Sequence, residues 1–256
     1  MQPGMAPAVG LLPARRVIAT AWDLVTSRPK EVLLPVAAVE VPVAIVAALI
    51  IAGALSTVLR DVALDGQDRT YLALLLIVGA GQALFAQVAH GAAIVSIAAV
   101  LRGKPVPLAG ALDPAFTRMG GLLALLVILV TISVLLALTI IGLVLLPYLV
   151  VRLALAHQAF MLEGRSPFAA LGRSWALMRG HMLRMLGVIL LTFLIFLGPA
   201  ILISALDGLV AGSRGAQVAV QALVSVVQGV LAVPLVALAA ATTTVFYLNL
   251  EDTQRG

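Results

Sequence analysis

The chain has 256 residues, of which 62% are hydrophobic and 11% are charged, and its mean hydropathy is +1.17. A soluble domain carries about 25% charged residues, so this composition excludes a water-soluble enzyme built around one core. The net charge is +5, but the basic residues flank apolar runs longer than the roughly 18 residues that mark a membrane span. The charge therefore favours anionic lipid headgroups, and not nucleic acid, as the partner.

The apolar runs predict an all-α fold, a polytopic transmembrane bundle with cytoplasmic interfacial helices. Residues 1–30 are expected to be a cytoplasmic segment in which Pro13–Ser27 forms an amphipathic helix, residues 31–250 a six-span membrane domain, and residues 251–256 a cytoplasmic tail. The spans are expected at about 32–59, 71–101, 119–138, 142–162, 185–206 and 217–248.

The third and fourth spans come from one long apolar run. Met119–Leu162 contains a single charged residue, Arg152. As one helix it would measure about 66 Å, roughly twice the hydrocarbon thickness. We therefore predict a hairpin that turns near Thr139–Gly142.

The basic residues predict the orientation. Twelve of the 16 Lys and Arg residues fall on the side of the N-terminus, three (Arg60, Arg69 and Arg214) fall in the opposite loops, and Arg152 lies within a span. The positive-inside rule then places both termini in the cytoplasm. Met1–Pro13 has no basic segment before its apolar residues, so we expect no cleaved signal peptide. The excess of Arg over Lys indicates a GC-rich bacterial genome, and thus the bacterial inner membrane.

The sequence also predicts an interfacial amphipathic helix in the segment Ser166–Arg184. Ser166 and Pro167 are a typical cap and first residue of a helix. An apolar stripe of Phe168, Leu171, Trp175 and Met178 follows, and the basic residues lie largely away from it. Two interpretations stay open: contacts to anionic headgroups, or a positively charged anchor that fixes topology. The candidate headgroup contacts are Arg173, Arg179, Arg184 and Trp175.

A weak internal repeat runs along the chain. LRGK at 101–104 and LEGR at 162–165 each leave an even-numbered span and precede a short amphipathic stretch. The unit would be an interfacial helix and two spans, present three times. The alternative is that any cytoplasmic loop between spans tends to be basic and amphipathic.

Three ionisable residues lie inside predicted spans. Glu40, Arg152 and His90 are about 13, 15 and 18 Å from the cytoplasmic edge if each residue rises 1.5 Å. An unpaired charge at such depth costs at least about 2.5–3.5 kcal/mol, so we expect Glu40 to pair with Arg152. The three residues form either a proton or substrate site, or a structural ion pair.

The stretch from residue 146 to 184, LPYLVVRLALAHQAFMLEGRSPFAALGRSWALMRGHMLR, resembles a known family. Its Ala-Leu-x-Arg-Ser-x-x-Leu-x-x-Gly pattern spans Ala170–Gly180, and the last span leaves through the aromatic-rich Val245–Leu250. These features are similar to the membrane domain attached to some glycerophosphoryl diester phosphodiesterases and to related stand-alone bacterial membrane proteins. The resemblance implies a six-span, non-catalytic membrane module and no catalytic residue.

No catalytic constellation or cofactor site is evident. Cysteine is absent, and the three histidines have no metal-ligand spacing. We therefore expect a non-enzymatic integral membrane protein, a scaffold or lipid-associated module. The alternatives are a small transporter with a polar site in the cytoplasmic half of the bundle and an intramembrane lipid-modifying enzyme. The latter would need paired acidic residues or a His/Asp cluster, and neither is found.

Overall fold

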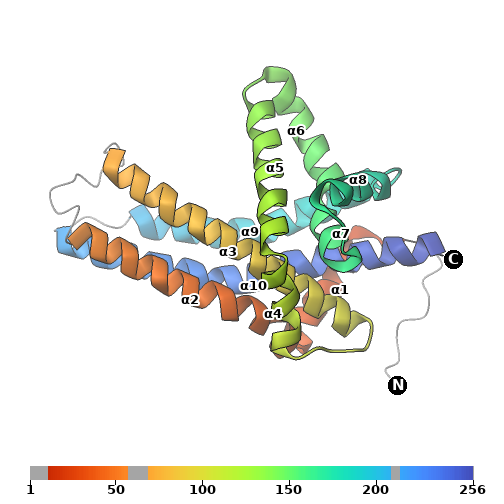
Figure 1. The fold of residues 1–256 in the computed structure, drawn as a ribbon, viewed down its shortest axis with the longest axis horizontal. Helices are drawn as coiled ribbons and strands as arrows, with labels where there is room; N and C mark the ends of the chain where they lie inside the picture. Colours follow the sequence, from red (N-terminus) through yellow and green to blue (C-terminus); the bar gives the residue numbers. More distant parts are fainter. Residues whose placement is uncertain (1–10, 57–68, 209–213, 256) are drawn as a thin grey trace.

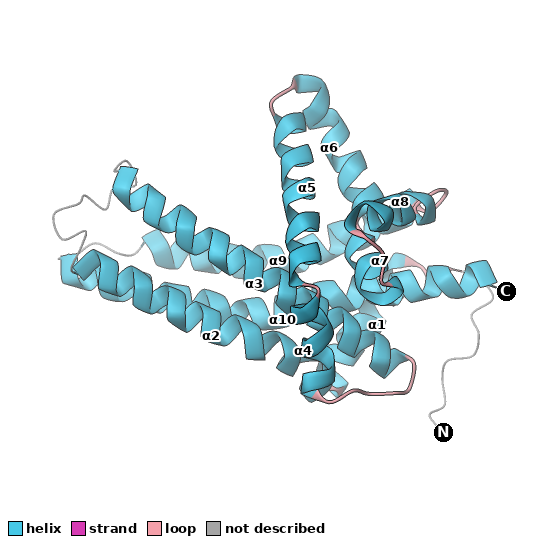
Figure 2. Cartoon of the chain, in the orientation of Figure 1, coloured by secondary structure: helices cyan, strands magenta, loops and turns pink. Residues whose placement is uncertain are grey.

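The computed structural model describes residues 11–56, 69–208 and 214–255, and this part of the chain is helical with no strand (Figure 2). The predicted all-α fold is confirmed. Residues 1–10 and most of the loop between the first two spans lie outside the described residues. The helices are α1 (Ala14–Ser27), α2 (Pro29–Ser56), α3 (Arg69–Leu101), α4 (Leu108–Thr117), α5 (Met119–Ala137), α6 (Ile140–Leu153), α7 (Ala156–Glu163), α8 (Pro167–Leu177), α9 (Met182–Gly208) and α10 (Arg214–Arg255).

The described helices include enough long apolar segments for a multi-pass membrane protein. Five segments are long and apolar enough to cross a membrane, and they correspond to α2, α3, α5, α6 with α7, and α10. A sixth qualifies only as a bent pair, because α8 meets α9 at an angle of 107°. The five single segments overlap five of the predicted spans, and the bent pair overlaps the predicted span 185–206 only through α9.

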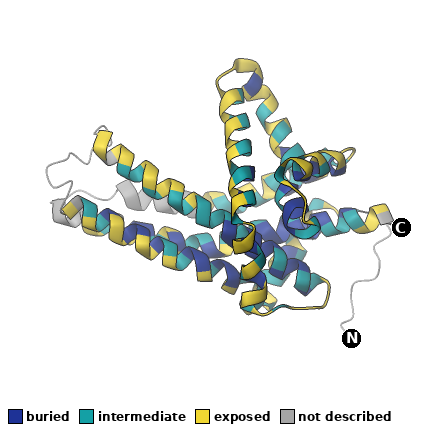
Figure 3. Cartoon of the chain, in the orientation of Figure 1, coloured by how far each residue is buried: buried dark blue, intermediate teal, exposed yellow. Residues whose placement is uncertain are grey.

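Four long helices form the body of the molecule. α2 packs on α3 and α10, and α9 packs on α10, so that these helices run alongside one another (Figure 1). The C-terminal ends of α2 and α9 lie at one end of this group, and α1 and the C-terminal end of α10 lie at the other (Figure 1). The buried residues gather toward the end that holds α1, where the short helices join the long ones (Figure 3).

The α5–α6 hairpin rises steeply from the side of this group (Figure 1). Its predicted turn is confirmed: Thr139 caps α6, and its hydroxyl accepts the N–H of Gly142 at 2.9 Å. A Cβ on Gly142 would lie 1.9 Å from the carbonyl oxygen of Leu136, so the turn requires glycine there. The buried residues of α5, Leu122 and Leu125, lie in its first two turns, so the hairpin joins the body at its foot.

The short helices α1 and α8 each bury one face. In α1, Val17 and Ala21 are buried, whereas Trp22 is exposed. Ser166 caps α8 and Pro167 begins it, as predicted. The buried residues of α8 are Ala170, Ser174 and Leu177, whereas Phe168 and Trp175 of the predicted apolar stripe face outward.

Candidate functional site

Arg152 lies in the last turn of α6, beside two aromatic rings that contact each other edge-on. Its guanidinium carbon is 4.8 Å from the ring centre of Trp175 and 5.3 Å from that of Tyr148. Nε donates to the Tyr148 hydroxyl at 3.1 Å, and Nη1 donates to the Trp175 backbone carbonyl at 3.1 Å. No carboxylate of the described residues forms an ion pair with it. We call Arg152, Tyr148 and Trp175 the arginine clamp.

Ser174 fixes the helix on which the clamp depends. The backbone hydrogen bonds of the helix are interrupted between α6 and α7. The buried Ser174 side chain of α8 bonds to backbone groups at this interruption. Its hydroxyl donates to the carbonyl of Arg152 at 2.8 Å and accepts the N–H of Leu155 at 3.2 Å. Inside a membrane a freed backbone group needs such a partner. Ser174 therefore places Trp175, its neighbour, against Arg152.

The predicted ion pair between Glu40 and Arg152 is wrong. Glu40 lies on α2, which packs against α3 and α10, whereas Arg152 lies on α6 and bonds to α8. Glu40 is 9% exposed, and its Oε1 has no hydrogen-bond partner among the described residues. Equal depth along two spans does not place two side chains on facing sides, and Trp175 offered Arg152 a nearer acceptor and an aromatic face.

His90 also has a different neighbour from the one expected. Its ring contacts that of His157 edge-on, with the centres 5.4 Å apart, and no hydrogen bond or ion pair joins it to Glu40 or Arg152. Nε2 of His157 lies 2.7 Å from Oε1 of Gln87. The structure thus replaces the predicted three-residue site with a cluster of Gln87, His90 and His157.

Sequence reasoning missed His157 as a site residue. It lies inside the predicted fourth span, so the rule that singled out Glu40, that an ionisable residue within a span is functional by default, also applies to it. The neighbouring Gln158 is fully buried and donates to Thr243 of α10 at 2.6 Å, while its Oε1 has no partner in the described part of the chain.

Glu163 joins three helices at the end of α7. Its carboxylate accepts Arg173 Nε at 2.9 Å, and it also accepts hydrogen bonds from Arg165 and from the buried hydroxyl of Tyr247 on α10. Arg118, at the start of α5, donates to the carbonyls of α7 residues 160 and 161. This network holds α7 and α8 against α10 and the foot of the hairpin.

The predicted headgroup contacts therefore have different surroundings. Arg173 is 27% exposed and paired with Glu163. Arg184 donates to the carbonyl of Leu11 at 3.2 Å. Arg179 is exposed and forms no ion pair among the described residues. Trp175 belongs to the arginine clamp. Of the predicted headgroup contacts, Arg179 is thus the cation most available to a ligand.

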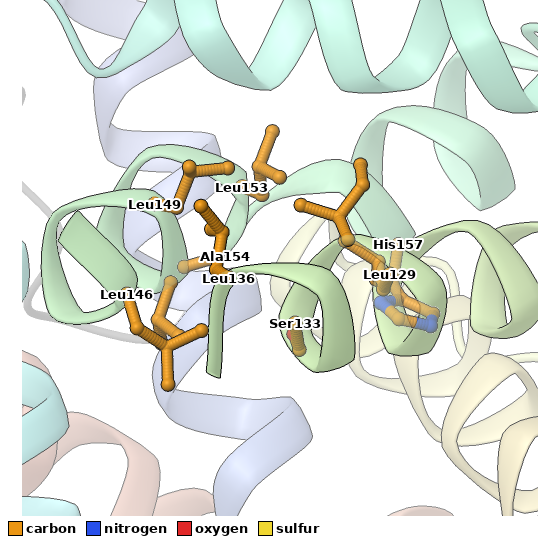
Figure 4. A pocket seen from close by; sticks show the side chains of 10 residues that line it. Leu129, Ser133, Leu136, Leu146, Leu149, Leu153, Ala154 and His157 are labelled. Atoms are coloured by element: carbon orange, nitrogen blue, oxygen red, sulfur yellow. The ribbon is translucent and has the colours of Figure 1, made fainter. Parts of the chain in front are cut away.

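Two cavities lie between neighbouring helices. One, of about 240 Å³, lies between α5 and α6; eight aliphatic residues line it together with Ser133 and His157 (Figure 4). The other, of about 360 Å³, lies between α2 and α3, and its most polar lining residue is Gln82. Neither is lined by Glu40 or Arg152. The described residues include no group of three or more His, Cys, Asp or Glu that could hold a metal ion.

Comparison with protein-family models, curated proteins and solved structures finds no match to this chain. The resemblance to the phosphodiesterase membrane domain therefore rests on residues 146–184 and 245–250 alone.

Proposed function

We propose that this chain is a non-enzymatic, lipid-associated membrane module that binds a phosphate headgroup at the arginine clamp. The observation that carries this proposal is the position of Arg152, a cation on an otherwise apolar span, stacked on Trp175 and Tyr148 with no carboxylate partner among the described residues. A membrane protein keeps such a charge where it meets a headgroup or another polar partner.

The clamp leaves most of the guanidinium free to bind an anion. Arginine has five N–H donors, and the described residues accept only one from Nε and one from Nη1. The remaining N–H groups on Nη1 and Nη2 form the planar fork that suits two phosphate oxygens. The two hydrogen bonds and two ring contacts hold this fork in one orientation, so little side-chain entropy is lost when an anion binds.

The surroundings of the clamp also suit the membrane interface. Trp and Tyr concentrate at headgroup level because each has an apolar body and a polar end. Arg179 lies in the turn that follows α8 and is exposed, which adds a second positive charge at the C-terminal end of this helix. Phe168, at the start of α8, is 74% exposed and can enter the acyl region.

The structure favours this function over a transporter. A transport site at Glu40 and Arg152 would need the two residues to share a cavity, but they lie on helices with different partners and neither lines the cavities between α2 and α3 or between α5 and α6. We propose the bacterial inner membrane as the location of the chain, and the basic-residue bias supports an orientation with both termini in the cytoplasm. In that orientation the clamp belongs to the cytoplasmic half of the bilayer.

Lipid-dependent unfolding tests the proposal. The purified protein in neutral detergent is titrated with phosphatidylglycerol, and the rise in its unfolding temperature gives the affinity. We expect Arg152→Gln to weaken binding about tenfold, since a charge-assisted hydrogen bond is worth about 1.5–3 kcal/mol. Arg152→Lys should also weaken it, because an ammonium lacks the planar fork.

Arg16→Gln is the matched control, because Arg16 is an exposed cation of α1, remote in sequence from the clamp. It should change affinity less than about twofold, as surface charges contribute little. Equal affinity of the wild type and Arg152→Gln would refute the clamp as the site. Equal binding of phosphatidylglycerol and phosphatidylcholine would refute selection of anionic lipids.

A further inference from the structure

The cavity between α5 and α6 has the features of a ligand site separate from the arginine clamp. We propose that it binds a single-chain amphiphile whose polar end carries a hydroxyl, either a long-chain alcohol or an uncharged carboxylic acid. The cavity lies on the α5 side of α6, whereas Tyr148 and Arg152 face α8. The proposal therefore does not depend on lipid binding at the clamp.

The cavity is polar at one end and aliphatic along the rest. His157 lies beside Leu129 near the foot of the hairpin, whereas Leu136 and Leu146 lie toward its turn (Figure 4). Ser133 lies between these two ends. This gradient matches a molecule with one polar end and one hydrocarbon chain, with the polar end at the foot.

The hydrogen bond between His157 and Gln87 determines which chemical group of a ligand can bind at the polar end of the cavity. An amide oxygen only accepts hydrogen bonds, so Nε2 of His157 donates to Oε1 of Gln87, 2.7 Å away. In an uncharged ring Nδ1 is then an acceptor, and no described residue donates to it. A ligand hydroxyl can donate to this nitrogen, whereas an ether or ester oxygen cannot.

Ser133 supplies a second polar contact within the same cavity. Its side chain lines the wall contributed by α5, and its hydroxyl forms no hydrogen bond with any described residue. A carboxylic acid has both a donor and an acceptor, so it could donate to His157 and accept from Ser133. An alcohol hydroxyl has both functions as well, since its oxygen can accept while its proton is donated.

The cavity is large enough for part of one chain. Its volume of about 240 Å³ exceeds the 150 Å³ of an apolar cavity that accepts benzene. Its remaining lining is aliphatic, and the cavity is partly open. A single chain can therefore place its polar end and part of its hydrocarbon in the cavity while the rest extends outside.

Photolabelling of the full-length protein in neutral detergent tests this site. The probe is hexadecanoic acid with a diazirine in its chain, and the labelled peptides are identified by mass spectrometry. We expect labelling of residues between 129 and 157, competed by hexadecanol and hexadecanoic acid but not by hexadecyl methyl ether. His157→Phe should reduce specific labelling about fivefold, which corresponds to the loss of one hydrogen bond.

Two further variants make the result decisive. His181→Phe is the same change at a histidine outside the cavity and should label like the wild type. Ala154→Leu narrows the cavity while His157 is kept, and it should also reduce labelling, even where His157→Phe impairs folding. Labelling outside the hairpin, competition by the methyl ether equal to that by the alcohol, or unchanged labelling of both His157→Phe and Ala154→Leu would overturn the proposal.

Discussion

At the scale of single residues, the environment of a charge inside a span depends on which side chains of the packed helices lie within bonding distance of it. Glu40 and Arg152 occupy similar depths along their spans, yet they share no contact. Arg152 instead gains two hydrogen bonds and two aromatic faces from Tyr148 and Trp175. Glu40 stays buried with an oxygen that no described residue satisfies. The two charges should therefore contribute to stability independently.

A double-mutant cycle measures this independence. Arg152→Gln should lower the free energy of unfolding in detergent by about 1–3 kcal/mol, because it removes charge-assisted hydrogen bonds and ring stacking. Glu40→Gln should leave stability unchanged or raise it, since it removes a buried ionisable group with an unsatisfied oxygen. The two effects should add within about 0.5 kcal/mol. A coupling energy above about 2 kcal/mol would show that Glu40 and Arg152 do interact and would contradict the structure.

At the scale of helices, α2 and α10 approach each other through small residues. A Cβ on Gly229 of α10 would lie 2.1 Å from the Cβ of Ala44 on α2, far inside van der Waals contact. Helix pairs in lipid associate through such close packing, because the surrounding hydrocarbon supplies no hydrophobic force between them. The glycine thus sets the distance between two helices of the core.

Substitution of Gly229 by alanine should separate these helices. We expect Gly229→Ala to lower the free energy of unfolding by about 1–3 kcal/mol, the usual cost of overpacking. Gly79 of α3 is the matched control, since nothing lies within 4 Å of a Cβ built there. Gly79→Ala should be neutral or slightly stabilising, because alanine has the higher helix propensity. Equal effects of the two substitutions on thermal unfolding would show that the α2–α10 contact is not tight.

At the scale of the whole molecule, α2, α3, α9 and α10 run alongside one another, whereas the α5–α6 hairpin stands steeply across them (Figure 1). The ends of α2 and α9 that lead into the loops predicted to face outward lie together, and α1 and the C-terminal end of α10 lie at the opposite end. The orientation of this arrangement in the membrane rests on the basic residues.

Cysteine labelling tests that orientation. The chain has no cysteine, so a single introduced thiol reports its own position. Gln67→Cys, in a loop outside the described residues, should react with a membrane-impermeant thiol reagent in intact cells, whereas Ser166→Cys should react only after the cells are opened. Reaction at Ser166 but not at Gln67 in intact cells would reverse the topology.

The sequence by itself determined the all-α class, the positions of the spans, the turn at Thr139 and the cap at Ser166. These features depend on local quantities, namely the transfer of apolar residues from water and the hydrogen bonds of helix ends. The sequence also showed that Arg152 is an unusual residue. It did not reveal which partner Arg152 has, nor that His157 is a site residue.

Only the tertiary structure decided which polar side chains meet. The break between α6 and α7, filled by Ser174, turns the chain so that Trp175 stacks on Arg152. The contact of His157 with Gln87 joins residues 70 positions apart, and that of Glu163 with Tyr247 joins residues 84 apart. Such contacts depend on the rotation and bending of packed helices, and hydropathy does not record these because every face of a membrane span is apolar.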